Sequence, residues 1–285
     1  MCRTITLNNG IEMPRAGFGV YQIAPDETKK AVLAALEAGV RLIDTAQAYG
    51  NEKAVGEAIA ASGIERSEIF ITDKVWISNA GDVPAQKSID ASLAALGVDY
   101  IDLMLIHQPF GDYYGTWRAL EKALSSGKVR AIGLSNFTAG RFIDLAEHAD
   151  VKPAVVQLET HVYCQQHKMR DIISAWGTRL MAWAPLAEGQ NGFFDDPRIK
   201  RIAERHGKSV AQIALKYLVD LDTIVIPKSV RPERIKENAD IDDIVLEADE
   251  IKELRALDGG KPLLADFENP DLVRFLLNYS KTHNL

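Results

Sequence analysis

The stretch RLIDTAQAYGNEKAVGEAIAASGIERSEIFITDKVW (residues 41–76) contains one complete strand–helix–strand unit. Its two apolar runs, 41–46 and 69–75, are short and rich in Ile and Val, as buried strands are. Residues 51–63 lie between them and have helical apolar spacing, with Asn51 as a favourable N-cap and Gly63 as a stop. Two strands joined through a helix are predicted to pair in parallel, because a parallel crossover needs that length of chain.

The same unit recurs along the whole chain. The apolar runs are 16–22, 41–46, 69–75, 101–107, 131–136, 154–159, 179–184 and 223–228. Helical patterns cover 26–39, 51–63, 84–97, 114–127, 139–149, 166–177, 209–220 and 232–238. The runs are apolar throughout, which is typical of strands covered on both faces. Eight such units predict a single (β/α)8 TIM barrel, with residues 1–285 as one domain.

An open, doubly wound sheet is the main alternative fold. That fold usually places a glycine-rich fingerprint after its first strand, and GFGVYQ (17–22) lacks the third glycine. Ahead of the first unit, RTITLNNGIEMP (3–14) predicts an N-terminal β-hairpin that turns at Asn9-Gly10 and closes the bottom of the barrel. Beyond Leu257 we expect a C-terminal loop and tail, with clear periodicity only near its end.

The composition excludes several classes of protein. The chain is 47% hydrophobic and 26% charged, as ordinary globular proteins are. Its net charge of -7 argues against nucleic acid or an anionic membrane as a partner. No apolar run is long enough to span a bilayer, and the N-terminus lacks a signal-peptide core. Cys2 and Cys164 form neither a disulfide framework nor a metal-ligand spacing, so we expect a cytoplasmic protein without a metal site. We also expect a monomer.

Ionisable side chains end three consecutive strands. Asp44 and Lys74 end the second and third strands, His107 ends the fourth, and Tyr49 follows Asp44 in the loop. The C-terminal ends of barrel strands are where active sites collect. A buried Asp44 needs a partner, and Lys74 on the neighbouring strand can supply it. A cationic amine close to Tyr49 is expected to lower the phenol pKa from about 10 and make it a better proton donor.

Together these groups suit reduction of a carbonyl compound. Tyr49 would deliver a proton to the carbonyl oxygen, while His107 would orient that oxygen as it gains charge. A nicotinamide would supply hydride to the carbon. Tyr21, Trp76 and His107 would line the substrate pocket, with the tail folded over it. Each residue alone is more often structural, as an ion pair, a cap or packing, but their joint placement favours a catalytic role.

A dinucleotide phosphate is expected after the last strand, in IPKSVRPERIKEN (226–238). Cations gather where this helix begins: Lys228, Arg231 and Arg234. They oppose the helix dipole unless an anion binds there. A Lys, Ser and Arg cluster suits a 2′-phosphate, so NADPH is preferred over NADH. The alternative is a solvated helix start in which Glu233 and Glu237 pair with the cations.

Polar and aromatic residues also end the remaining strands. Ser135, Asn136 and Gln157 could fix a carboxamide through paired donors and acceptors, and Trp183 could stack on a flat ring. Each also has an ordinary interpretation, as a turn, a satisfied core amide or a packing indole.

Three segments resemble signatures of the aldo-keto reductase family: GVRLIDTAQAYGNEKAVG (39–56), VRAIGLSNF (129–137) and IPKSVRPERIKEN (226–238). The bacterial 2,5-diketo-D-gluconate and methylglyoxal reductase branch is the most similar. The resemblance implies a barrel that uses NADPH to reduce aldehydes and ketones to alcohols, with no Rossmann domain. It implies a catalytic tetrad of Asp44, Tyr49, Lys74 and His107. The cofactor residues it implies are Ser135, Asn136, Gln157, Trp183, Leu186, Lys228, Ser229, Val230, Arg234 and Asn238.

Some residues depart from that family's usual pattern. Trp183 and Ala184 stand where Tyr and Ser are common, and Asp73 stands where Thr is common, beside Lys74. Two other functions remain open on the same barrel. One is a non-catalytic subunit that senses the nicotinamide redox state. The other is a Schiff-base lyase that uses Lys74, which would need a neutral amine and is therefore opposed by Asp44.

Overall fold

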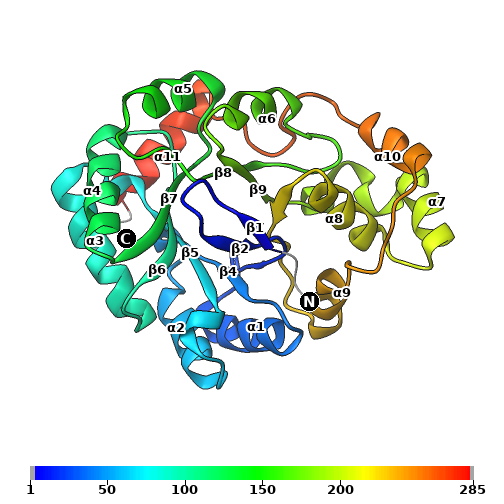
Figure 1. Cartoon of the computed structure of the whole chain (residues 1–285), viewed down its shortest axis with the longest axis horizontal. Coiled ribbons are helices and arrows are strands. Elements are labelled where there is room, and N and C mark those ends of the chain that lie inside the picture. Colours follow the sequence, from blue (N-terminus) through cyan, green and yellow to red (C-terminus); the bar gives the residue numbers. More distant parts are fainter. Residues whose placement is uncertain (1–3, 283–285) are drawn as a thin grey trace.

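The computed structural model describes residues 4–282, and its central feature is an eight-stranded parallel barrel (Figure 1). The strands are β3 (Phe18–Gly19), β4 (Leu42–Asp44), β5 (Phe70–Val75), β6 (Ile101–Ile106), β7 (Val129–Ser135), β8 (Val155–Glu159), β9 (Arg179–Trp183) and β10 (Thr223–Val225). The sheet closes between its first and last strands, where Gly17 N donates to Val225 O at 2.8 Å and Val225 N donates to Arg15 O at 2.8 Å. The predicted barrel is confirmed, and the open doubly wound sheet is excluded.

Helices surround the barrel on its outside, as Figure 1 shows. The predicted ones are α1 (Pro25–Glu37), α2 (Glu52–Ala61), α3 (Asp82–Leu96), α4 (Tyr113–Ser125), α5 (Ala139–His148), α6 (His167–Ser174), α8 (Val210–Asp220) and α9 (Pro232–Ala239). The sequence interpretation missed α7 (Pro197–His206) and α10 (Ala248–Arg255), and left α11 (Pro270–Thr282) undefined. Short 3-10 turns complete the fold: η1 (Gln47–Tyr49), η2 (Arg66–Glu68), η3 (Ile77–Asn79) and η4 (Ala187–Asp195).

The barrel interior is a packed apolar core. Side chains from alternate strand positions meet there, including Leu42, Leu103, Leu105, Ala131, Met181 and Ile224. Met13 of the hairpin joins this core and is fully buried. Removing such a side chain from water contributes roughly 1.5–3 kcal/mol. A larger core fills the space between the outer face of the strands and the helices.

The hairpin β1 (Thr4–Thr6) and β2 (Glu12–Pro14) covers the N-terminal end of the barrel. Its turn differs from the expected two-residue Asn9-Gly10 turn. Leu7 N donates to Ile11 O at 2.8 Å, so the loop has a third residue, and Gly10 takes a φ of 86° that suits glycine. Asn9 Nδ2 donates to Arg130 O at 3.0 Å, which attaches the hairpin to the start of β7.

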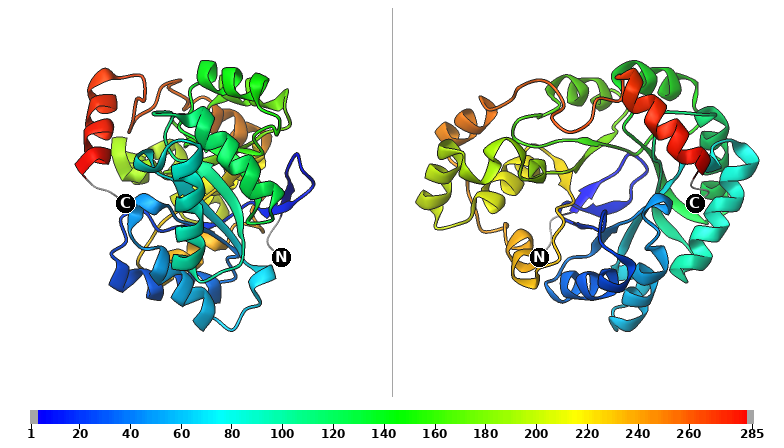
Figure 2. Two further views of the ribbon diagram at one scale, coloured as in Figure 1. Left: turned by 90° about the vertical axis from the view of Figure 1, so that its left-hand side faces the viewer. Right: turned by 180° about the vertical axis from the view of Figure 1, so that it is seen from behind.

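The chain after α10 runs across the C-terminal end of the barrel, opposite the end that the hairpin covers. Figure 2 shows the hairpin and α11 on opposite sides of the molecule, with α11 in red across the face seen from behind. Side chains of α11 pack on Trp76, Ile77 and Phe110 at the C-terminal ends of the strands. None of the helices within residues 4–282 combines the length and the apolar character needed to cross a bilayer.

Candidate active site

Asp44 meets its expected partner at the C-terminal rim of the barrel. Lys74 Nζ lies 2.6 Å from Asp44 Oδ1 and also donates to Thr45 O at 2.7 Å. The other carboxylate oxygen, Oδ2, accepts from Gln157 Nε2 at 2.8 Å. Lys74 is fully buried and Asp44 nearly so. The carboxylate at the end of β4 is therefore satisfied from two sides, by an ammonium and an amide.

The ion pair keeps the Lys74 amine charged. Burial lowers the pKa of Lys74, but the charge and hydrogen bond of Asp44, with a further contribution from Tyr49, more than offset that effect and raise the pKa overall. Burial also raises the pKa of Asp44, against the opposing effects of Lys74 and Gln157. Schiff-base chemistry needs a neutral amine, so this geometry disfavours it.

Tyr49 lies on the other side of the Lys74 ammonium. Its hydroxyl is 3.4 Å from Nζ, and the ammonium lies 4.9 Å from the ring centroid. The expectation of a lowered phenol pKa was wrong for this structure. Burial raises the pKa of Tyr49 to about 12, and the Lys74 charge only limits that rise. Tyr49 therefore retains its proton at neutral pH, which a proton donor requires.

A buried glutamine that the sequence interpretation missed holds the Tyr49 turn in place. Gln47 Oε1 accepts from Trp76 N at 2.9 Å and from Asn79 Nδ2 at 3.0 Å, and Gln47 Nε2 donates to Ser92 Oγ at 3.1 Å. These bonds join η1 to η3 and α3. The signal was a polar residue within the same short stretch as Asp44, in a loop between two buried elements.

Asn51 does not act as the expected side-chain cap of α2. It occupies the N-cap position, but makes no capping hydrogen bond. Its amide instead donates to Val20 O at 3.0 Å and Ile23 O at 3.2 Å, which fastens the loop after Tyr49 to the loop after β3. Tertiary partners thus replaced the local partner that the sequence pattern predicted.

Asp73 faces away from Lys74, because neighbouring strand residues point to opposite sides of a sheet. Its Oδ1 accepts from Lys74 N at 2.7 Å, while Oδ2 is buried without a hydrogen-bond partner. Burial and the neighbouring Glu52 carboxyl group raise the pKa of Asp73 well above 3.8. Burial and Glu52 therefore favour the neutral form of the Asp73 carboxyl group.

His107 follows β6 and completes the group of four side chains. Burial, and then the charge of Lys74, lower its pKa well below 6.5, so the imidazole is neutral. Its ring centroid lies 5.0 Å from that of Trp76 and 5.7 Å from that of Tyr49. The structure thus brings Asp44, Tyr49, Lys74 and His107 to one place, as the strand ends predicted.

Aromatic side chains lie next to the Tyr49 and His107 rings. Tyr21 is 50% exposed, and its ring centroid lies 5.0 Å from that of Tyr49. Trp76 is buried beside His107. It also makes an edge-to-face contact with Tyr279 of α11, with 6.4 Å between the ring centroids. The predicted pocket residues Tyr21 and Trp76 therefore flank the four ionisable side chains.

The predicted carboxamide-binding residues lie on the same rim, partly occupied by protein contacts. Asn136 has a left-handed backbone with a φ of 63°, its Nδ2 donates to His107 O at 3.1 Å, and its Oδ1 accepts from Trp183 Nε1 at 2.8 Å. Gln157 Nε2 is engaged with Asp44, which leaves its Oε1 to accept from a ligand. Ser135 is buried beside them.

Buried polar atoms without hydrogen-bond partners gather at this rim. Ser135 Oγ, His107 Nδ1 and Trp76 Nε1 are all of this kind. Buried polar atoms are normally hydrogen-bonded, so such atoms call for an explanation. A polar ligand in front of the four ionisable side chains would provide it, and the donor and acceptor types fit a nicotinamide and a carbonyl oxygen.

The helix start after β10 is a cluster of cations. Pro232 takes the first position of α9, as predicted. Three cations lie exposed there: Lys228, Arg231 and Arg234. None of the ion pairs found among residues 4–282 joins these cations to Glu233 or Glu237, so the solvated-pair alternative is not supported. The cluster retains its positive charge for an anion.

The remaining predicted cofactor residues lie in the loop before α9, in the last turn of α9 and in the loop after β9. Ser229 is partly buried, and its Oγ accepts from Arg231 N at 3.1 Å. Val230 is 49% exposed, Asn238 is buried, and Leu186 is partly buried just before η4.

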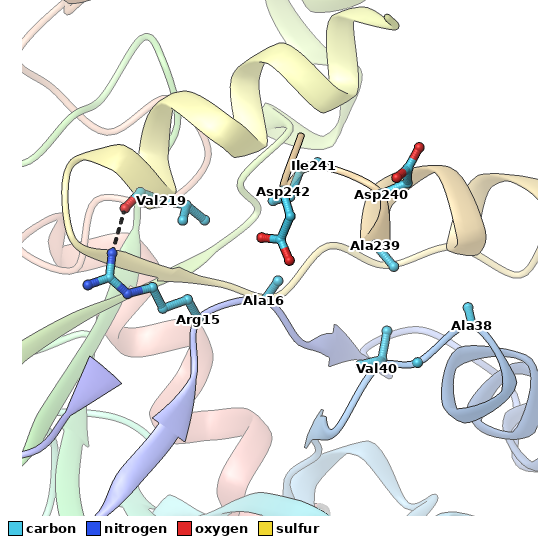
Figure 3. Close-up of a pocket in the computed structure, with 10 residues that line it drawn as sticks. Arg15, Ala16, Ala38, Val40, Val219, Ala239, Asp240, Ile241 and Asp242 are labelled. Atoms are coloured by element: carbon cyan, nitrogen blue, oxygen red, sulfur yellow. Dashed lines mark hydrogen bonds between the residues drawn. The ribbon is translucent and has the colours of Figure 1, made fainter. Parts of the chain in front are cut away.

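A separate cavity of about 410 Å³ lies at the opposite, N-terminal end of the barrel (Figure 3). It is lined by segments that precede β3 and β4 and by the loop after α9. Its arginine, Arg15, is already engaged by Val219 O at 3.3 Å and Asp222 Oδ1 at 2.8 Å. Within residues 4–282, no group of three or more His, Cys, Asp or Glu side chains could hold a metal ion.

Comparisons with known proteins cover most of this chain. The family model described as "Aldo/keto reductase family" matches residues 15–259. The glyoxal reductase of Bacillus subtilis is 43% identical over 274 residues, which cover 95% of this chain and 98% of the relative.

Solved structures match most of the chain as well. The aldo/keto reductase of Brucella melitensis is 43% identical with a TM-score of 0.87, covering 90% of this chain and 100% of that one. A silkworm (Bombyx mori) aldo-keto reductase in complex with NADP is 33% identical with a TM-score of 0.88. The match covers 93% of this chain and 95% of that one. A closed barrel, four ionisable side chains at its rim and a match over most of its length lead to one conclusion: the chain belongs to the aldo/keto reductase family.

Proposed function

We propose that this protein reduces aldehydes and ketones to alcohols with NADPH. The observation that carries the proposal is the arrangement of the Lys74 ammonium, 2.6 Å from Asp44 and 3.4 Å from the Tyr49 hydroxyl, with neutral His107 beside them. Such a set can give up one proton and stabilise the charge that remains.

In the proposed reaction Tyr49 donates its proton to the carbonyl oxygen. Lys74 stabilises the phenolate that is left, and Asp44 keeps Lys74 charged and correctly placed. Neutral His107 donates a hydrogen bond to the oxygen as it gains charge. Bound NADPH supplies the hydride that the carbonyl carbon accepts. One hydride and one proton convert the carbonyl to an alcohol, and the phenolate recovers its proton from solvent.

We assign the nicotinamide to the rim formed by β7, β8 and β9. Ser135, Asn136 and Gln157 would hold its carboxamide, and Trp183 would stack on its ring. The unpartnered Ser135 Oγ supports this assignment. The NADP complex of the silkworm relative supports the choice of cofactor.

The adenosine end belongs near α9 in this proposal. Lys228, Ser229 and Arg234 would bind the 2′-phosphate, and this favours NADPH over NADH. Asn238 would contact the adenine. Leu186 and Val230 would flank the cofactor on either side.

The substrate is a small-molecule carbonyl compound that fits between aromatic walls. Tyr21, Trp76 and His107 would contact it, and such walls accept many aldehydes. The similarity to a glyoxal reductase supports short dicarbonyl compounds of the methylglyoxal type as substrates. Diketo acids are the other substrate class of the proposed branch. We further propose that residues 1–285 form one domain that acts as a cytoplasmic monomer, without a nucleic-acid or membrane partner.

Turnover of 4-nitrobenzaldehyde with NADPH tests the proposal, with Tyr49→Phe as the deciding variant. Removing the donor hydroxyl should lower kcat by about 10²–10⁴-fold. The affinity for NADPH, measured by fluorescence titration, should stay unchanged. Substantial reduction by the variant would reject Tyr49 as the donor. NADPH binding without any turnover in the natural protein would favour the redox-sensing subunit instead.

A further inference from the structure

Glu159, at the C-terminal end of β8, binds the backbone of the C-terminal tail. The residue is 3% exposed. Its Oε1 accepts from Leu263 N at 2.5 Å and Leu264 N at 3.0 Å, and its Oε2 accepts from Leu264 N at 3.1 Å and Ala265 N at 3.0 Å. Three consecutive N–H groups thus converge on one carboxylate, which is the arrangement of a backbone anion nest.

A buried histidine completes this carboxylate's surroundings. His161 is fully buried, and its Nδ1 accepts from Tyr163 N at 3.2 Å. The proton therefore lies on Nε2, which donates to Glu159 Oε1 at 3.0 Å. Burial opposes the charge on Glu159, but hydrogen bonds from His161 and from the tail amides hold its pKa below 4.5. The carboxylate is ionised at neutral pH, and its hydrogen bonds are charge-assisted.

The tail depends on these contacts for its path over the barrel. Gly259 N donates to Tyr163 O at 2.8 Å where the tail begins. Among the described residues, the hydrogen bonds that join residues 261–267 to the barrel all end on Glu159. Further on, Asn269 N donates to Asp266 O at 3.0 Å, and α11 starts at Pro270. Glu159 thus fixes the segment that leads directly into α11.

Helix α11 in turn supports the wall of the proposed substrate pocket. Four side chains of α11 pack on the cluster of Trp76, Ile77 and Phe110, and Phe267 just before the helix does so as well. The four are Val273, Leu276, Leu277 and Tyr279. Trp76 lies between this helix and the imidazole of His107, with ring distances of 6.4 Å to Tyr279 and 5.0 Å to His107. A shift of α11 would therefore change the space in front of His107 without touching Asp44, Tyr49 or Lys74.

We propose that Glu159 is a positioning residue that fixes α11 against Trp76 and thereby sets which aldehydes the pocket accepts. The inference rests on the proposed function, because it assigns a substrate wall to that reaction. Glu159 touches no reacting atom in this proposal. It acts on substrate selection through the tail, and its loss should raise KM for substrates that contact the wall more than it lowers kcat.

The test is Glu159→Gln, which keeps the side-chain shape but replaces one acceptor oxygen with an N–H donor that faces the tail amides. Hydrogen–deuterium exchange should become faster at residues 263–265 and along α11. For 4-nitrobenzaldehyde kcat/KM should fall about tenfold, mainly through KM, since misplacement remote from the chemistry can cost about 100-fold. Methylglyoxal, which covers less of the wall than an aromatic aldehyde does, should lose much less of its kcat/KM, with NADPH affinity unchanged.

Two further variants serve as controls. Glu268→Gln changes an exposed carboxylate of the same tail and should alter neither exchange nor kinetics. Leu276→Ala shortens a side chain of α11 that packs on the cluster of Trp76, Ile77 and Phe110. If Glu159 acts through α11, the double variant Glu159→Gln/Leu276→Ala should lose less than the sum of the two single losses.

Unchanged exchange in Glu159→Gln would overturn the proposal, and so would equal losses on the two aldehydes or fully additive effects. The exchange measurement needs no turnover, so it decides whether Glu159 anchors the tail even if the natural protein reduces neither aldehyde. That absence of turnover would reject the proposed function and the specificity role together, and leave the anchor as a purely structural feature.

Discussion

At the scale of single residues, the Lys74 ammonium connects a buried carboxylate to the proposed proton donor. The residue types at the strand ends were sufficient to predict this grouping, because adjacent parallel strands bring their C-terminal ends together. The sign of the Tyr49 pKa shift was not predictable, because it depends on how completely the folded chain removes the hydroxyl from water.

Lys74→Met separates the catalytic role of Lys74 from its structural role. The variant should lower kcat by about 10²–10⁴-fold, since the phenolate loses its stabilising charge. It should also lower the free energy of unfolding by roughly 3–5 kcal/mol, because Asp44 is left buried without its partner. In the double variant Asp44→Asn/Lys74→Met, urea unfolding should show much of that stability restored, while kcat stays at least as low as in Lys74→Met. Recovery of turnover would contradict the assigned role.

Asp73→Asn should change how stability depends on pH. The pKa of Asp73 is raised in the folded protein, mainly by burial and then by Glu52. The stability that protonated Asp73 contributes is therefore fully present below its unfolded-state pKa of about 3.9. That stability is lost as pH rises toward the folded-state pKa. An amide cannot ionise, so the variant should lose less stability than the natural protein as pH rises above about 4 in urea unfolding. Parallel curves for the two proteins would show that Asp73 is not the group responsible.

At the scale of secondary-structure elements, the sequence identified every barrel strand and one helix after each strand. Helix α7 was missed although its signals are ordinary: Asp196 caps it, Pro197 takes its first turn and Gly207 follows its end. It was overlooked because it is a second helix between β9 and β10, where one crossover helix was expected. The third loop residue of the hairpin was missed because Asn-Gly also fits a two-residue turn.

Helix α9 gives the prediction on cofactor choice. Arg234 is exposed in its first turn, and no ion pair within residues 4–282 involves it. Arg234→Ala should weaken NADPH binding by about 10–100-fold, since hydrogen bonds between charged groups contribute roughly 1.5–3 kcal/mol. NADH, which lacks the 2′-phosphate, should be affected less than about threefold.

Lys236→Ala removes a cation from the same helix outside its first turn and is the matched control. It should affect the two cofactors equally and weakly, as measured by fluorescence titration. Equal losses of NADPH and NADH binding in Arg234→Ala would reject the phosphate assignment.

At the scale of the whole molecule, the two ends of the barrel differ in the side chains that fill them. The hairpin fills the N-terminal end with apolar side chains such as Met13, while the C-terminal end holds the ionisable group and is crossed by α11 (Figure 2). The barrel followed from the sequence because its period repeats eight times. The path of the tail did not, because three backbone amides on Glu159 fix it, and no sequence pattern marks a contact between residues about a hundred positions apart.

The central claim is that a phenol beside a charged amine protonates a carbonyl compound held against a reduced nicotinamide. A crystal structure with NADP+ and an unreactive carbonyl ligand tests it most directly. The account predicts the Tyr49 hydroxyl about 2.6–3.2 Å from the carbonyl oxygen, Lys74 still on Asp44, and the nicotinamide C4 about 3–3.5 Å from the carbonyl carbon. A ligand bound away from Tyr49, or a nicotinamide whose C4 faces elsewhere, would contradict it.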